Sequence, residues 1–205
     1  METLMNPSTL KRIQEIYRLW KPVYPYLAHH ILEYYDRQDG NILEIGPFCG
    51  VLFALDEMKI GASFSIATFP SEMVDFFREE TKNRSVQEKI RVIETDSSLN
   101  GFEENDIDLA IFRGAFFFPS LFQVNLARIC HILRPGGVAF VGGGFGKFTP
   151  DFIIRDIGER SRDLNLQIGK AEIRKEELWQ EVQAISGKGR VELISEGGLW
   201  VLMKK

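Results

Sequence analysis

Cysteine and histidine are scarce in this sequence. The 205 residues include two cysteines, Cys49 and Cys130, and three histidines. Neither cysteine stands in a metal-ligand spacing, and two lone thiols are typical of a protein kept reduced in the cytoplasm. We therefore expect a cytoplasmic chain with no metal site, whose stability comes from an ordinary hydrophobic core.

Long hydrophobic runs and an excess of basic charge are also missing. No apolar run approaches the ~20 residues needed to span a bilayer, and residues 1–10 contain no apolar signal-peptide core. The net charge is −4, with lysines and arginines scattered along the chain, which argues against a nucleic-acid backbone as the main partner. We expect no secretion and no membrane span, and the oligomeric state cannot be read from the sequence.

What is present is the composition of one globular domain, with 44% hydrophobic and 26% charged residues. Residues 1–37 show helical spacing of apolar side chains, which predicts an N-terminal helical cap. Ser8 is the expected N-cap, and Pro22 and Pro25 are expected to break the helix. Residues 38–205 are expected to form the ligand-binding core of the same domain.

From residue 41 onward, short apolar runs alternate with helical patterns. The sequence predicts strands at 41–45, 63–67, 90–93, 107–112 and 138–141, and helices at 51–58, at 71–82, from Ser120 and near Pro150. This β-α-β rhythm predicts parallel strands with helices on both faces.

The last two strand patterns, at 191–195 and 199–203, are separated by only three residues. A parallel crossover needs a dozen or more residues, so these two strands must form an antiparallel hairpin. The expected fold is therefore an α/β, Rossmann-like sheet of seven mostly parallel strands with a reversed last strand.

Segment 41–50 is the most informative part of the chain. It predicts a strand, a glycine-containing loop and the start of a helix, an arrangement in which backbone N–H groups can approach a polar ligand. Glu44 lies near the end of the strand, where open α/β sheets bind ligands. Its carboxylate is a candidate partner for a ligand ammonium group. The alternative is that Gly46 and Gly50 serve only close packing of the turn.

Glu44-Ile45-Gly46-x-x-x-Gly50 resembles the first motif, acid-x-Gly-x-Gly-x-Gly, of the class I S-adenosylmethionine (SAM)-dependent methyltransferases. Downstream, Asp106–Ala110 is similar to the family's approach to the fourth strand, and Leu133-Arg134-Pro135-Gly136-Gly137 is similar to its segment before the fifth. The Gly197-Gly198 hairpin matches the family's reversed strand. The resemblance covers roughly residues 26–205, and the order and spacing of the motifs are fairly specific.

The resemblance implies a SAM site at the carboxyl edge of the sheet. Glu44, Gly46 and Gly50 would hold the methionine part, Thr68 the ribose, and Asp96 with Ser97 the adenine. The full set of implied cofactor-binding residues is Glu44, Ile45, Gly46, Phe48, Gly50, Thr68, Asp96, Ser97 and Arg113.

Two positions depart from the family pattern. Phe48 replaces the middle glycine of the first motif, and we expect its ring to turn away from the pocket into the helical layer. Thr68 stands where the family places an acid that holds both ribose hydroxyls, and a threonine can supply only one hydroxyl contact.

Residues 112–118, which follow the fourth predicted strand, lack the Asn/Asp-Pro-Pro-Tyr/Phe motif of nucleic-acid amino methyltransferases. This segment instead resembles small-molecule methyltransferases of the ubiquinone and menaquinone biosynthesis type. Phe116–Phe118 are either the wall of an apolar site or part of the core. Arg113 is either an anion clamp or a solvated strand-end arginine.

The sequence thus predicts methyl transfer from SAM to a small-molecule acceptor, with no catalytic residue assigned. Positioning alone can support this reaction, because the sulfonium is already activated. One alternative is a SAM-fold protein that binds a ligand or partner without catalysis, which Phe48 and Thr68 favour. A nicotinamide-dependent reductase is a weaker alternative, because the Gly-x-Gly-x-x-Gly spacing is absent.

Overall fold

A seven-stranded sheet forms the centre of the computed structural model, which describes residues 5–183 and 190–205. The strand order is β3-β2-β1-β4-β5-β7-β6, and β7 runs antiparallel to both of its neighbours. The strands are β1 (Asn41–Ile45), β2 (Ser63–Thr68), β3 (Ile90–Glu94), β4 (Ile107–Arg113), β5 (Leu133–Gly143), β6 (Arg190–Ile194) and β7 (Leu199–Lys204). The predicted fold class and the predicted terminal hairpin are both confirmed.

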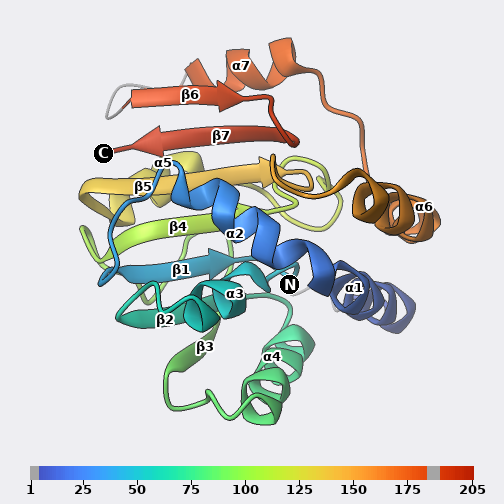
Figure 1. Cartoon of the computed structure of the whole chain (residues 1–205), viewed down its shortest axis with the longest axis horizontal. Helices are drawn as coiled ribbons and strands as arrows, with labels where there is room; N and C mark the ends of the chain where they lie inside the picture. The colour runs from blue at the N-terminus through green and yellow to red at the C-terminus, as the bar shows by residue number, and fades with distance from the viewer. Residues whose placement is uncertain (1–4, 184–189) are drawn as a thin grey trace.

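Helices flank the sheet on both faces (Figure 1). They are α1 (Pro7–Trp20), the 3-10 turn η1 (Lys21–Val23), α2 (Tyr24–Leu32), α3 (Val51–Glu57), α4 (Ser71–Asn83), α5 (Leu126–Ile132), α6 (Asp151–Gln167) and α7 (Lys175–Gln183). None of these described helices is long and apolar enough to cross a membrane.

Side chains alternate between two hydrophobic cores along each central strand. In β4, Leu109 belongs to the core that includes α1 to α4, whereas Ala110 belongs to the core that includes α5 and α7. Phe140 and Val141 of β5 divide in the same way. Because successive strand residues point to opposite faces, a sheet covered on both sides needs nearly continuous apolar runs.

The N-terminal helices differ from the prediction in two details. Asn6, rather than Ser8, caps α1, because its side chain accepts a hydrogen bond from the Ser8 N–H at 2.9 Å. Pro22 and Pro25 do not interrupt the helical path; each lies in the first turn of the next helix, where the missing N–H is tolerated.

The helix predicted from Ser120 begins later, at Leu126. Asn125 caps it, accepting a hydrogen bond from the Arg128 N–H at 2.9 Å. Residues 114–125 instead form an irregular loop after β4. Helix α7 was not predicted from the sequence, and its Leu178 and Val182 complete the second core.

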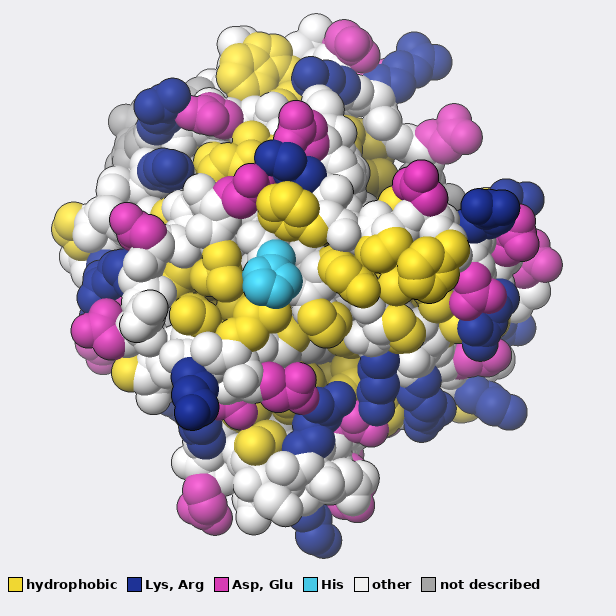
Figure 2. All heavy atoms as spheres, viewed as in Figure 1, with side chains coloured by type: hydrophobic (Ala, Val, Ile, Leu, Met, Phe, Trp, Pro, Cys, Tyr) yellow, Lys and Arg dark blue, Asp and Glu magenta, His cyan; other side chains and the backbone are white. Residues whose placement is uncertain are grey.

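Helices α1 and α6 pack against each other (Figure 1). They lie beyond the carboxyl ends of the parallel strands, at the edge where open α/β sheets bind ligands. On the face of the molecule that Figure 2 shows, acidic and basic side chains are interspersed rather than sorted by sign.

Candidate functional site

The carboxylate of Glu44 is buried beneath the loop after β1. The side chain has no solvent exposure, and its oxygens accept hydrogen bonds from the N–H groups of Gly50 (2.8 Å), Val51 (3.2 Å) and Leu52 (3.0 Å). Burial raises the pKa of the Glu44 carboxyl, and the three N–H donors and the Arg113 guanidinium oppose that shift. Glu44 therefore caps the N-terminus of α3 from within the protein.

Gly46 and Gly50 of the first motif are each required to be glycine, for different structural reasons. Gly46 has φ +94°, and a Cβ atom there would lie 2.7 Å from the ring of Phe112. A Cβ atom on Gly50 would lie 2.3 Å from the ring of Tyr24, so a glycine there lets α2 pack closely on the loop. Ile45 is buried in the second core.

Thr68 lies at the carboxyl end of β2 and is fully buried. Its hydroxyl has no hydrogen-bond partner within the described part of the chain. Buried polar atoms are normally hydrogen-bonded. A ligand donor or acceptor placed here would therefore satisfy the Thr68 hydroxyl.

The ring of Phe122 covers the carboxyl ends of three neighbouring strands. It lies 5.6 Å from the ring of Phe69, which follows β2, and 5.2 Å from that of Phe112 in β4. It also lies 6.3 Å from the ring of Phe48, which follows β1. Because β1 lies between β2 and β4 in the sheet, Phe122 closes over the end of β1.

These observations decide how far the residues present fit SAM. The positive φ of Gly46 and the unpaired Thr68 hydroxyl fit a cofactor at this edge. Phe122 lies over the same strand ends. Gly46 and Thr68 therefore fit the cofactor, whereas Phe122 occupies part of the same edge of the sheet.

Phe48 is buried, but its ring packs on the loop after β4 and does not turn away from the site as predicted. Its ring packs 4.8 Å from that of Phe118 and 6.3 Å from that of Phe122, both in the loop after β4. Gly114, at φ +80°, permits this packing, since a Cβ atom there would lie 2.7 Å from the Phe48 ring. The ring thus joins the aromatic wall of the site.

Cys49 is buried in the same loop, and its thiol donates to the Gly46 carbonyl oxygen at 2.9 Å. Burial raises the pKa of the Cys49 thiol, which disfavours the thiolate that a nucleophile requires. Cys49 is therefore a small buried side chain that fills the loop.

Asp96 and Ser97 lie after β3 and are exposed. Asp96 accepts hydrogen bonds from the N–H and the hydroxyl of Ser98, and these bonds lower the pKa of its carboxyl. Arg128 of α5 donates to the backbone carbonyls of Ser98, Leu99 and Phe102. The loop that carries Asp96 is thereby fixed to α5.

Arg113, at the end of β4, is not solvated, and it forms no ion pair with an acid among the described residues. It is 5% exposed, and its Nε donates to the Phe48 carbonyl oxygen at 2.9 Å. One terminal nitrogen donates to the Tyr24 hydroxyl at 3.2 Å. The guanidinium also lies 4.8 Å from the centre of the Trp20 ring. Burial raises the pKa of Tyr24, so its hydroxyl stays protonated.

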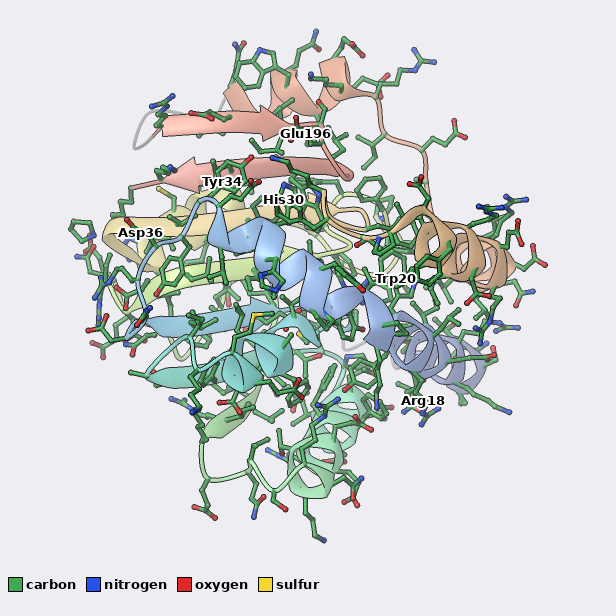
Figure 3. All side chains as sticks on the ribbon, in the orientation of Figure 1. Arg18, Trp20, His30, Tyr34, Asp36 and Glu196 are labelled. Carbon is green, nitrogen blue, oxygen red and sulfur yellow. The ribbon has the colours of Figure 1, made fainter. Side chains whose placement is uncertain are left out.

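A cavity of about 350 Å³ opens beside Arg113, between α1, α6 and the ends of β4 and β5. Aromatic side chains form much of its wall: Trp20, Phe48, Phe117, Phe118 and Phe145. Trp20, at the C-terminal end of α1 in Figure 3, stacks on Phe145 with ring centres 4.5 Å apart. Pockets of this size and apolar character accept small organic molecules.

Sequence reasoning did not find the polar residues that α6 and the segment after it contribute to this cavity. Ser161 and Asn165 are buried on α6, one turn apart, and line the cavity together with Arg162 and Lys170. The spacing of four residues between Ser161 and Asn165, which places both side chains on one face of a helix, is the part of this arrangement that the sequence contains. The sequence alone does not indicate which element they face.

No protein-family model matches this chain. It is 25% identical over 147 residues to a hybrid PKS-NRPS synthetase, lepA, of Aspergillus flavus. The match covers 69% of this chain but only 4% of that protein, so the chain spans a small part of its curated relative.

Solved structures resemble the whole chain. A putative SAM-dependent methyltransferase from Methanococcus maripaludis has a TM-score of 0.78 and 23% identity, covering 100% of this chain and 97% of that one. A SAM-dependent methyltransferase from Aquifex aeolicus has a TM-score of 0.59 and 16% identity, covering 98% and 97%. Geranyl diphosphate C-methyltransferase from Streptomyces coelicolor, solved with S-adenosylhomocysteine, has a TM-score of 0.59 and 12% identity, covering 99% and 86%. This chain therefore has the fold of the class I SAM-dependent methyltransferases.

Proposed function

We propose that this chain is an enzyme that transfers a methyl group from SAM to a small-molecule acceptor. The observation that carries the proposal is the position of the aromatic cavity next to the first-motif loop. Phe48 belongs to that loop and also lines the cavity. A cofactor over the ends of β1 and β2 would therefore lie beside an acceptor in the cavity.

In this proposal, SAM supplies a methyl group already activated on its sulfonium, and the protein supplies alignment and exclusion of water. Gly46 lets the backbone turn beneath the cofactor, and Thr68 offers one hydroxyl to its ribose. Asp96 and Ser97 lie at the end of β3, where the adenine would be placed. Glu44 acts indirectly, by fixing the α3 N-terminus that faces the cofactor.

The second candidate is a protein of this fold that binds a ligand or partner without catalysis. Phe122 favours it, because its ring covers the strand ends that the cofactor needs. The full burial of Thr68 has the same implication. Under this alternative the aromatic cavity would still bind a ligand, but no methyl group would be transferred.

Two measurements distinguish the candidates. Calorimetric titration with SAM and with S-adenosylhomocysteine tests cofactor binding, and transfer of label from methyl-tritiated SAM to a small-molecule fraction tests catalysis. Binding with transfer supports the enzyme. Binding without transfer to any acceptor tested supports the second candidate, and no binding at millimolar ligand contradicts the cofactor assignment.

The proposal includes a cytoplasmic location and a small-molecule rather than nucleic-acid substrate, in keeping with the two buried thiols and the net charge of −4.

A further inference from the structure

Arg113 carries a buried positive charge without a matching carboxylate. The residue is 5% exposed, and no acid of the described chain forms an ion pair with it within 4.0 Å. Glu44 interacts with it at longer range, but its oxygens are taken up by three backbone N–H groups. Burying a charge is costly unless it is paired, so this guanidinium calls for a further anionic partner.

The hydrogen bonds that Arg113 makes leave some of its guanidinium N–H donors without an acceptor in the described chain. The Phe48 carbonyl and the Tyr24 hydroxyl accept from two of its five N–H donors. Nη1 has no hydrogen-bond partner in residues 5–183 and 190–205. The rings of Trp20, Tyr24 and Phe48, at 4.8, 5.2 and 5.6 Å, favour a cation but do not neutralise it.

The cavity beside Arg113 has an excess of positive charge. Arg113, Arg162 and Lys170 line it, whereas Glu172 is the one acidic side chain among its lining residues in the described chain. The remainder of the wall is largely aromatic and apolar. The cavity thus combines an apolar body with a cationic inner end.

We propose that this cavity binds an acceptor with a flat apolar body and a single carboxylate, and that Arg113 holds the carboxylate. The free edge of one guanidinium matches a carboxylate, which accepts two parallel hydrogen bonds from arginine. The aromatic rings of Trp20, Phe117 and Phe118 would contact the apolar body. This inference names the substrate class and so rests on the proposed function.

The test compares carboxylates with their neutral amides on the unmodified protein. The matched pairs are benzoate and benzamide, 2-naphthoate and 2-naphthamide, and indole-3-acetate and indole-3-acetamide, each titrated by calorimetry. For at least one pair we expect the carboxylate to bind about tenfold or more tightly than the amide. If no carboxylate binds more tightly than its amide, the inference is wrong. If phenyl phosphate binds more tightly than every carboxylate, the class of anion is wrong.

Variants assign the preference to Arg113. In Arg113→Gln we expect the carboxylate and its amide to bind within about twofold of each other, whereas Arg160→Gln, on the exposed side of α6 and paired with Asp156, should keep the wild-type ratio. Arg113→Gln that melts at a lower temperature but keeps the ratio would make Arg113 purely structural. Loss of the ratio in Arg162→Gln/Lys170→Gln, with Arg113 intact, would also overturn the assignment.

The same preparation is titrated with S-adenosylhomocysteine, so that the two proposals fail separately. Carboxylate preference without cofactor binding would contradict the methyltransferase while keeping the anion site. Cofactor binding without carboxylate preference would contradict the anionic acceptor while keeping the methyltransferase.

Discussion

The Oε2 atom of Glu44 accepts a hydrogen bond of 2.8 Å from the backbone N–H of Gly50, which precedes the first turn of α3. This contact joins the end of β1 to the start of the helix through the interior of the protein. The acid of the first motif therefore determines the shape of the loop. Any ligand at this edge would meet the backbone that Glu44 holds in place.

Replacing Glu44 by Gln should lower the free energy of unfolding by about 2–3 kcal/mol, because the amide keeps one acceptor oxygen and turns an NH₂ group toward N–H donors. Urea denaturation measures the loss. Glu94→Gln, at the exposed end of β3, is the control and should leave stability unchanged. A Glu44→Gln protein of normal stability but weaker SAM binding would instead give Glu44 the ligand contact that the sequence first indicated.

Replacing Phe122 by Ala should tighten SAM binding, because it removes the ring that closes over β1. We expect a gain of up to about tenfold, equivalent to ~1.4 kcal/mol. The variant should also melt at a lower temperature, because a partly buried ring is lost. Calorimetry measures the affinity. Phe152→Ala, which removes an exposed ring of α6, should change neither quantity. Unchanged SAM affinity in Phe122→Ala would mean that the ring does not obstruct the cofactor.

Acidification should destabilise the protein through His30. His30 lies on α2 (Figure 3), is fully buried and has no hydrogen-bond partner for either ring nitrogen among the described residues. Burial lowers its pKa, although Glu33 and Glu196 oppose the shift and Lys147 adds to it. The unfolded chain therefore binds this proton at a higher pH than the folded chain does, so the free energy of unfolding should fall as the pH decreases through ~6.5.

The slope due to His30 cannot exceed about 1.4 kcal/mol per pH unit, the value for one proton. Urea unfolding from pH 7.5 to 5.5 should give a flatter profile for His30→Leu than for the wild type. His29→Leu, at the exposed neighbouring position, should keep the wild-type slope. Equal slopes in wild type and His30→Leu would contradict the role of His30.

Near the N-terminal end of β4, Asp108 is fully buried and pairs with Arg37 and Arg134. It also accepts a hydrogen bond from the Asn41 N–H at 2.8 Å. Asp108→Asn should lower the free energy of unfolding by about 2–3 kcal/mol. This is below the ~3–5 kcal/mol for breaking a fully buried pair, since both arginine side chains are partly exposed. Urea denaturation measures it, and Asp106→Asn is the matched control. A loss of under about 0.5 kcal/mol would show that the pairs contribute little.

Six of the seven predicted strands match the structure to within one residue at each end, because apolar runs bounded by turn residues are their direct signature. The exception is β5, which begins at Leu133, five residues before the predicted start at Val138, and so includes the Pro135-Gly136-Gly137 segment. The hairpin of β6 and β7 could be predicted from the length of the connection between them, since three residues cannot connect parallel strands. The start of α5 could not be predicted in this way. Phe122 and Leu126 have helical spacing, but Phe122 packs on Phe69 and Phe112 from a loop.

The sequence predicted where the candidate residues lie along the strands, but not which partners their side chains have. The sequence located Glu44 at the end of β1, but only the structure shows its oxygens bound to the backbone of α3. For Arg113 the sequence offered a clamp or a solvated residue, and the structure shows a buried cation among aromatic rings. Side-chain direction depends on tertiary packing, which local sequence patterns do not encode.

Thr68 provides a test that separates ligand binding from stability. Its buried hydroxyl has no partner within the described part of the chain, and valine has nearly the same shape without the hydroxyl. Thr68→Val should leave the free energy of unfolding unchanged or slightly higher, because no protein hydrogen bond is lost and an unpaired polar group is removed. If the hydroxyl binds the ribose, the affinity for S-adenosylhomocysteine should fall about 2- to 12-fold, corresponding to one hydrogen bond of about 0.5–1.5 kcal/mol. Thr68→Ser keeps the hydroxyl and should retain the affinity, at some cost in packing. Equal affinities for Thr68→Val and the wild type would remove Thr68 from the cofactor site, whereas a marked loss of stability in Thr68→Val would mean that the hydroxyl is paired within the protein after all.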